Sequence, residues 1–200
     1  MADRRLAIPA IALAAQIVGA MACFAQACPD SKTGKTGFVV ERGNSSRTEV
    51  FHDGPVVRTT MRSAGSPLLE TTQYEGLFDL ERLDRGRRST FKPKTNLPGL
   101  FPLKTKQHAT AVFEVDMEGG TEKMRTIELQ ILDQDELYIG GCKYRILKIE
   151  RRQSRAGGPP SFINIDYYAP ELKLVIAKEY REANGRTSVI KFDRIYPLDR

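Results

Sequence analysis

The sequence has few residues of the kinds that hold metals or act as catalytic nucleophiles. It contains 2 histidines and 3 cysteines in 200 residues, whereas a metal site needs several such ligands close together. The histidines, His52 and His108, lie far apart in the chain, and no Gly-x-Ser-x-Gly motif is present. The sequence therefore predicts neither a metal nor a cofactor, and it carries no signature of a serine nucleophile.

A phosphate-binding loop is also lacking, although the triplet Gly34-Lys35-Thr36 matches the end of one. Such a loop needs a glycine five positions before the triplet's own glycine, and it must lead into a helix. Pro29 occupies that position and has no N–H to offer a phosphate. The residues that follow, Phe38-Val39-Val40, are typical of a strand. A nucleotide site is therefore not expected here.

Tryptophan, internal repeats and long blocks of one charge are missing as well. The formal net charge is +6, which could indicate a nucleic-acid partner. However, basic residues alternate with acidic ones, and only Arg87-Arg88 and Arg151-Arg152 form arginine pairs after the N-terminal segment. This pattern is typical of solvated strand faces, so no nucleic-acid partner is expected. The absence of repeats excludes a solenoid.

The N-terminal segment has the layout of a secretory signal. Arg4 and Arg5 precede an alanine-rich apolar run, which ends in the small-residue triplet Ala25-Gln26-Ala27. We predict a signal peptide over residues 1–27 and a single β-rich domain over residues 28–200, in a periplasmic or secreted protein. Cleavage after Ala25 and an uncleaved membrane anchor are the alternatives, although the run is weakly apolar for a transmembrane span.

Two cysteines, Cys28 and Cys142, follow the predicted signal peptide. An exported chain meets an oxidising compartment, so we expect these two to form a disulfide. The position of Cys28 directly after the cleavage site also allows lipid attachment, as in bacterial lipoproteins. Ala25 and Gln26 depart from the lipoprotein pattern, which has a large aliphatic residue three positions before the cysteine. Lipidation and free thiols stay open as alternatives.

Alternating polar and apolar residues between short turn signals dominate the rest of the chain, as in an antiparallel β protein. Asp53-Gly54 and Asn184-Gly185 are strong turn signals, and Gly140-Gly141 indicates a bulge or a close approach. A loop with three prolines spans residues 92–103. We count roughly eight to eleven strands. The predicted fold is mainly β, with a single strongly curved antiparallel sheet, a half-barrel or open barrel, and little helix.

The segment "YYAPELKLVIAKEYREANGRTSVIKFDRI" resembles the final strands of exported half-barrel proteins, a group that includes the periplasmic lipoprotein carriers. The resemblance covers mainly residues 165–195, with support from "LPGLFPL" and "GGCKYRILKIE". It implies an open, bent antiparallel sheet whose cavity holds an acyl chain or another hydrophobic ligand. The chain lacks the helical lid segments of those carriers.

A curved sheet with one apolar face can hold a greasy ligand in its concavity, or its own side chains can fill that space. We therefore hypothesise an exported, non-enzymatic protein that binds a lipid or acyl chain in the bacterial envelope. The predicted ligand-lining residues are Leu100, Phe101, Phe113, Leu129, Ile131, Leu174, Ile176, Ile190 and Phe192.

Two other functions stay open at this stage. One is a scaffold that binds an acidic envelope polymer or a partner protein through a basic strand face. The other is a hydrolase that uses paired carboxylates. Its candidate residues are Glu114, Asp116, Asp133, Asp135 and Asp166, with His108. Asp133 and Asp135 lie in "LDQDEL", where aspartate is also typical of a turn.

Overall fold

A computed structural model describes residues 27–44, 46–63, 66–118, 120, 123–155, 158–160, 162–181 and 186–198. The predicted signal peptide lies almost entirely outside these residues and stays a prediction. Among the described residues, no helix has the length and apolar character needed to cross a membrane. The elements are α1 (Thr33–Thr36), β1 (Phe38–Arg42), β2 (Ser46–Asp53), β3 (Val56–Ser63), β4 (Ser66–Tyr74), β5 (Phe78–Asp84), β6 (Arg87–Pro93), η1 (Leu97–Leu100), β7 (His108–Met117), β8 (Lys123–Ile139), β9 (Cys142–Arg155), β10 (Phe162–Ala169), β11 (Leu174–Arg181), β12 (Thr187–Lys191) and β13 (Arg194–Pro197).

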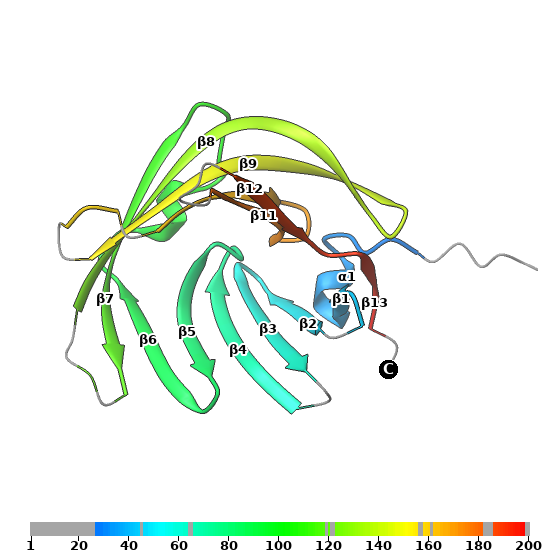
Figure 1. The fold of residues 1–200 in the computed structure, drawn as a ribbon, viewed down its shortest axis with the longest axis horizontal. Helices are drawn as coiled ribbons and strands as arrows, with labels where there is room; N and C mark the ends of the chain where they lie inside the picture. The colour runs from blue at the N-terminus through cyan, green and yellow to red at the C-terminus, as the bar shows by residue number, and fades with distance from the viewer. Residues whose placement is uncertain are drawn as a thin grey trace, which may run out of the picture.

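All the strands belong to one antiparallel sheet, which confirms the predicted fold class. From β1 to β12 each strand pairs with its neighbour in sequence, and β13 returns to pair with β1. The described residues form 13 strands, more than the roughly eight to eleven expected from turn signals. In Figure 1, β2 to β7 make one wall, and β8 to β12 arch over it. The sheet is thus a half-barrel with an interior.

The two edge strands, β12 and β13, are consecutive in the chain. Between them, the backbone N–H of Phe192 donates to the Ile176 carbonyl of β11 at 3.2 Å. The next N–H, that of Asp193, donates to the Glu41 carbonyl of β1 at 2.8 Å. The chain therefore crosses from one edge of the sheet to the other within two residues, although no strand pairing closes the barrel.

The long hairpin of β8 and β9 differs from its expected form in two places. The predicted close approach is present at Gly140, where a Cβ would lie 3.4 Å from the Cα of Arg194, but the alternative, a bulge, is absent. Instead, Gly140 and Gly141 form the two-residue turn of the hairpin, with φ of 55° and 84°. Both angles suit the hairpin turn that glycine favours. The expected turn at Asp133 and Asp135 is also absent, because β8 continues through it with a register shift after Ile131. A run of polar residues can stay in a strand when its partner strand continues beside it.

A disulfide joins Cys28 to Cys142 with a Cα–Cα distance of 5.5 Å, as predicted. It ties the start of the domain to the turn of the β8–β9 hairpin. Nearby, the Tyr144 hydroxyl donates to the Pro29 carbonyl at 3.2 Å. The sulfur of Cys28 is occupied in this bridge, so it is not free to carry a lipid while the bridge is intact. Removing a native disulfide from a small exported domain typically costs about 2–5 kcal/mol of stability.

Two clusters of buried apolar side chains fill one end of the half-barrel. One gathers around Phe78, Phe113 and Ile149, and residues of the proline-rich loop pack against it. The other gathers around Phe38, Tyr144 and Ile176. We call this the closed end. The opposite end, where β8 begins and β11 ends, is the open end.

Candidate ligand-binding cavity

The open end of the half-barrel contains a cavity of about 550 Å³. It lies between the inner faces of β2 to β6 on one wall and those of β8, β9, β11 and β12 on the other. Its volume is within the range of small-molecule sites. Its apolar lining residues are Met61, Leu69, Leu77, Phe91, Ile127, Leu174, Val175, Ile176, Ala177, Ile190 and Phe192.

Two of the strands that line the cavity become more polar toward the open end. On β11, Leu174 and Ile176 are buried, whereas Lys178 and Tyr180 are half-buried on the same face. On β8, Arg125 at the open end is followed on the same face by Ile127. Because strand residues two apart share a face, β8 and β11 each present an ordered series from charged to apolar.

Three threonines, whose side chains are short, line one wall of the cavity. Thr48, Thr59 and Thr71 line the cavity from β2, β3 and β4. The hydroxyls of Thr59 and Thr71 are hydrogen-bonded to each other at 2.7 Å. A buried hydroxyl that has a partner avoids most of the cost of leaving water. Thr59 and Thr71 can therefore face the cavity at little cost.

The β4–β5 turn forms the floor of the cavity by reaching across the half-barrel. Gly76 and Leu77 of this turn line the cavity, and the Leu77 carbonyl accepts a hydrogen bond from Arg151 of β9 at 2.8 Å. Glu75 pairs with Lys173 at 3.0 Å. The Glu75 carbonyl also accepts from the Tyr168 hydroxyl at 2.8 Å. These contacts join the two walls (Figure 1) and separate the cavity from the filled core.

Asp166 is the centre of a buried ionic network beside the cavity. It is 0% exposed, and its carboxylate pairs with Arg151 at 2.6 Å and Lys178 at 3.1 Å. The Asn164 side-chain amide also donates to it. Burial raises the pKa of Asp166, but the charges of Arg151 and Lys178 outweigh it, and the net pKa lies below its usual value. Asp166 therefore stays ionised and neutralises cations that face the cavity.

Cations outnumber carboxylates in the cavity lining. Asp79 is the carboxylate among the described lining residues, and it accepts a hydrogen bond from the Gln73 side chain at 2.7 Å. Arg82 also has a partner outside the cavity, the Asp84 carboxylate at 2.9 Å. The lining cations are Arg42, Arg82, Arg125, Arg151, Lys178 and Lys191. The lining thus carries a net positive charge.

Arg125 differs from the paired cations. Within the described residues, it makes no ion pair, and its guanidinium carbon lies 5.2 Å from the centre of the Phe91 ring. Burial lowers the pKa of Arg125, and the charges of Arg155 and Arg82 lower it further, against an opposing effect of Asp79. Arg125 is therefore a half-buried cation whose positive charge is not fully balanced by nearby carboxylates.

The structure divides the predicted lining residues into two groups. Leu174, Ile176, Ile190 and Phe192 do line the cavity, and Leu174 and Ile176 at the same time belong to the packed cluster around Tyr144. The other five lie in or against the filled core at the closed end: Leu100, Phe101, Phe113, Leu129 and Ile131. Leu100 and Phe101 cover that core rather than the cavity. The sequence prediction missed the cationic lining, although Arg125 alternates with the apolar residues of its own strand, which was the available signal.

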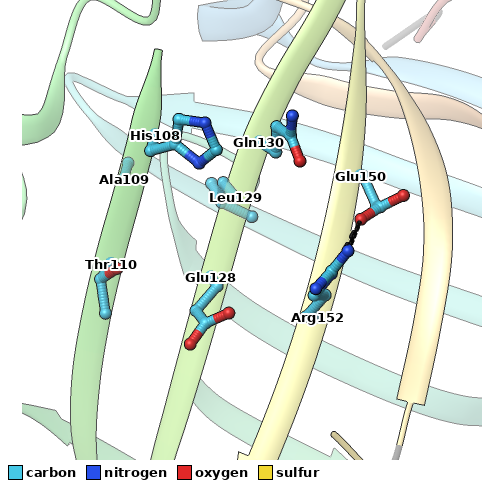
Figure 2. Close-up of a pocket in the computed structure, with 8 residues that line it drawn as sticks. All are labelled: His108, Ala109, Thr110, Glu128, Leu129, Gln130, Glu150 and Arg152. Carbon is cyan, nitrogen blue, oxygen red and sulfur yellow. Dashed lines mark hydrogen bonds and ion pairs between the residues drawn. The ribbon is translucent and has the colours of Figure 1, made fainter. Parts of the chain in front are cut away.

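The outer face of β7, β8 and β9 carries a second, smaller depression of about 140 Å³. Figure 2 shows His108 beside Gln130, and Glu150 paired with Arg152, at 2.8 Å. Glu128 and Glu150 give this face mixed charge. This depression therefore does not present a basic surface.

The carboxylates proposed for a hydrolase are distributed over different parts of the sheet. Glu114 of β7 pairs with Lys92 and Lys94, and Asp135 of β8 pairs with Lys148 at 2.6 Å. Asp116 and Asp133 are exposed on the same two strands. The pKa of Asp135 is lowered by its hydrogen bond to Lys148, as the pKa of Asp166 is lowered by its own network. A glycosidase acid needs the opposite, a raised pKa.

No family model and no curated protein matches this sequence. Among solved structures, the chain is similar to the hypothetical lipoprotein YmcC from Escherichia coli, with 10% sequence identity and a TM-score of 0.48. The similarity covers 84% of this chain and 90% of that one. A likeness of this size says nothing about what this chain binds.

Proposed function

We propose that this protein is an exported, non-enzymatic carrier that holds a hydrophobic ligand, such as a lipid or an acyl chain, in the cavity of its half-barrel. The observation that carries the proposal is the cavity of about 550 Å³ with an apolar interior and an open, polar end. Burying apolar surface in it contributes about 25 cal/mol for each Å² removed from water. An acyl chain of moderate length would supply enough surface for useful affinity.

Export fits this proposal through the disulfide and the predicted signal peptide. Disulfides persist in oxidising compartments such as the periplasm, and this one is tied to the first residue of the predicted mature chain. A carrier in the bacterial envelope would meet lipids there. The scaffold hypothesis stays a prediction, for which salt-sensitive binding to an acidic polymer is the test.

The test is to block the cavity with a larger side chain. Met61 lines the cavity, whereas Met124 is 39% exposed and does not line it. We expect Met61→Trp to weaken binding of the fluorescent apolar probe N-phenyl-1-naphthylamine at least about tenfold, because it fills the ligand's space. Met124→Trp is the matched control and should bind like the wild type.

Thermal unfolding of both variants shows whether they fold equally well. If the wild type does not bind the probe, or if both tryptophan variants bind it equally, the cavity is not a hydrophobic ligand site and the proposal fails.

A further inference from the structure

We propose that the ligand is an anionic amphiphile with a single carboxylate or phosphate head, and that Arg125 is the main contact for that head. This inference rests on the proposed carrier function and names the chemistry of its ligand. The chain would lie deeper in the cavity, over Ile127, Leu174 and Ile176, which line it below the charged rim.

The first argument is that Arg125 is a cation with no ion-pair partner among the described residues, since Asp79 offsets its charge only from beyond ion-pairing distance. Arg125 is half-buried, and within the described chain no carboxylate lies within ion-pairing distance of it. Arg82 and Arg155 add like charge nearby. Removing a charge from water is costly unless an opposite charge compensates it. An anionic head beside Arg125 would supply that compensation.

The second argument is that the carboxylates near the cavity already have partners. Asp166 is held by Arg151 and Lys178, and Asp79 accepts a hydrogen bond from Gln73. The first of these contacts accounts for Arg151 and Lys178, and Arg82 pairs with Asp84. Among the described residues, the lining cations left without an ion pair are Arg42, Arg125 and Lys191.

Two further cations face the same cavity from the seam where the sheet edges meet. Arg42 of β1 and Lys191 of β12 are exposed, and both line the cavity. Neither makes an ion pair within the part of the chain that the structure describes. Their charge would attract an anion to the cavity and raise its rate of entry.

The third argument is the order of residues along β8. Ile127 follows Arg125 on the same face, and both line the cavity. Two strand residues advance about 7 Å. A head bound at Arg125 therefore places the first carbons of its chain against an apolar side chain. The guanidinium carbon of Arg125 lies 5.2 Å from the centre of the Phe91 ring, and this cation–π contact favours its position at the edge of the cavity.

The experiment compares three ligands with the same alkyl chain: decanoate, decyl phosphate and decanol. Each competes with N-phenyl-1-naphthylamine for the wild type and for Arg125→Gln. In the wild type, the two anions should bind at least about tenfold more tightly than decanol, the usual effect of a charge-assisted hydrogen bond. Arg125→Gln should remove this preference and leave decanol affinity unchanged. Arg125→Lys, which keeps the charge, should retain most of it.

The matched control is Arg145→Gln. Arg145 is an exposed arginine of β9 that does not line the cavity. It should behave as the wild type does. Added salt should weaken binding of the two anions and leave decanol unaffected.

The outcomes separate the two proposals. If decanol binds as tightly as decanoate, or if Arg145→Gln acts like Arg125→Gln, the head site is wrong while the carrier function stands. If inorganic phosphate competes as well as decyl phosphate, the site is for a free anion, and the amphiphile is wrong. If no alkyl compound binds the wild type, the carrier proposal itself fails. The ligand comparison in the wild type decides the preference even if Arg125→Gln does not fold.

Discussion

The closed and open ends of the half-barrel are built from the same strands but have opposite chemistry. On β8, Leu129 and Ile131 are each 1% exposed in the packed core, whereas Arg125 of the same face lines the cavity. On the other wall, Phe78 of β5 belongs to the packed core, and threonines stand beside the cavity. One strand can therefore contribute to stability along half of its length and to ligand binding along the other half.

The boundary between the two ends is formed by few residues. The β4–β5 turn supplies the floor, and the Asp166 network holds the opposite wall beside it. Substitutions at the closed end, in the Asp166 network and at the floor should therefore change the stability of the fold and the affinity for the ligand to different extents.

The largest effect is expected at the closed end. Phe113→Ala removes a ring that is 0% exposed, and such changes cost about 3–5 kcal/mol of stability because they leave a void. Urea unfolding measures the loss. Probe affinity of the folded fraction should stay within about twofold of wild type, since Phe113 does not line the cavity. Val189→Ala, at a side chain that is 55% exposed, is the control. A loss of binding without a loss of stability would contradict the comparison.

The next effect concerns Asp166. Asp166→Asn leaves Arg151 and Lys178 without their shared carboxylate, so we expect a loss of about 3 kcal/mol at neutral pH. Because the folded pKa lies below the unfolded one, the carboxylate's contribution is complete above the unfolded pKa of about 4 and is lost as pH falls through the folded pKa.

Urea midpoints measured from neutral to acidic pH test this dependence. The wild type should lose stability on acidification more steeply than Asp166→Asn. Asp135→Asn is the control, because Asp135 also has a lowered pKa but sits at the surface. Equal acid sensitivity in the wild type and Asp166→Asn would show that the network does not matter.

The smallest of the three effects concerns the floor. Gly76 has a φ of 67°, and a Cβ there would lie 1.7 Å from the Lys173 carbonyl oxygen. Gly76→Ala should cost more than about 1 kcal/mol and weaken probe binding by displacing the floor. Gly54→Ala has a similar φ of 60° but open space around the new Cβ. Gly54→Ala should lose only the stability that the strained backbone costs, and its probe affinity should equal that of the wild type. Equal results for the two variants would mean that the turn does not shape the cavity.

Much of the fold could be predicted from the sequence because strand pairing here is local. Ala109, Ala111, Phe113 and Val115 alternate with polar residues, and all four are buried as expected. Sequential hairpins need no long-range information beyond their turns. The prediction was wrong where a turn signal competes with a continuing strand, as at Asp133 and Asp135, because the partner strand decides between the two.

The candidate site was predicted only in part. Four of the proposed lining residues face the cavity, two of them as part of the packed core as well, and the other five lie in or against the core without lining the cavity. The hydrophobic pattern marks both groups in the same way, since it reports which face of a strand points inward. It does not report what stands on the opposite wall, and that decides whether the inward face meets side chains or space.

By itself, the sequence determined the antiparallel strands, their inward faces and the two cysteines available for a disulfide, because alternation and residue type act locally. Only the tertiary structure decided that Arg125 and Ile127 line a cavity while Leu129 and Ile131 are packed. It also brought Asp166 to Arg151 and Lys178 from neighbouring strands. The physical reason is that cavity shape and ionic compensation depend on pairs of residues that meet only when the sheet curves on itself.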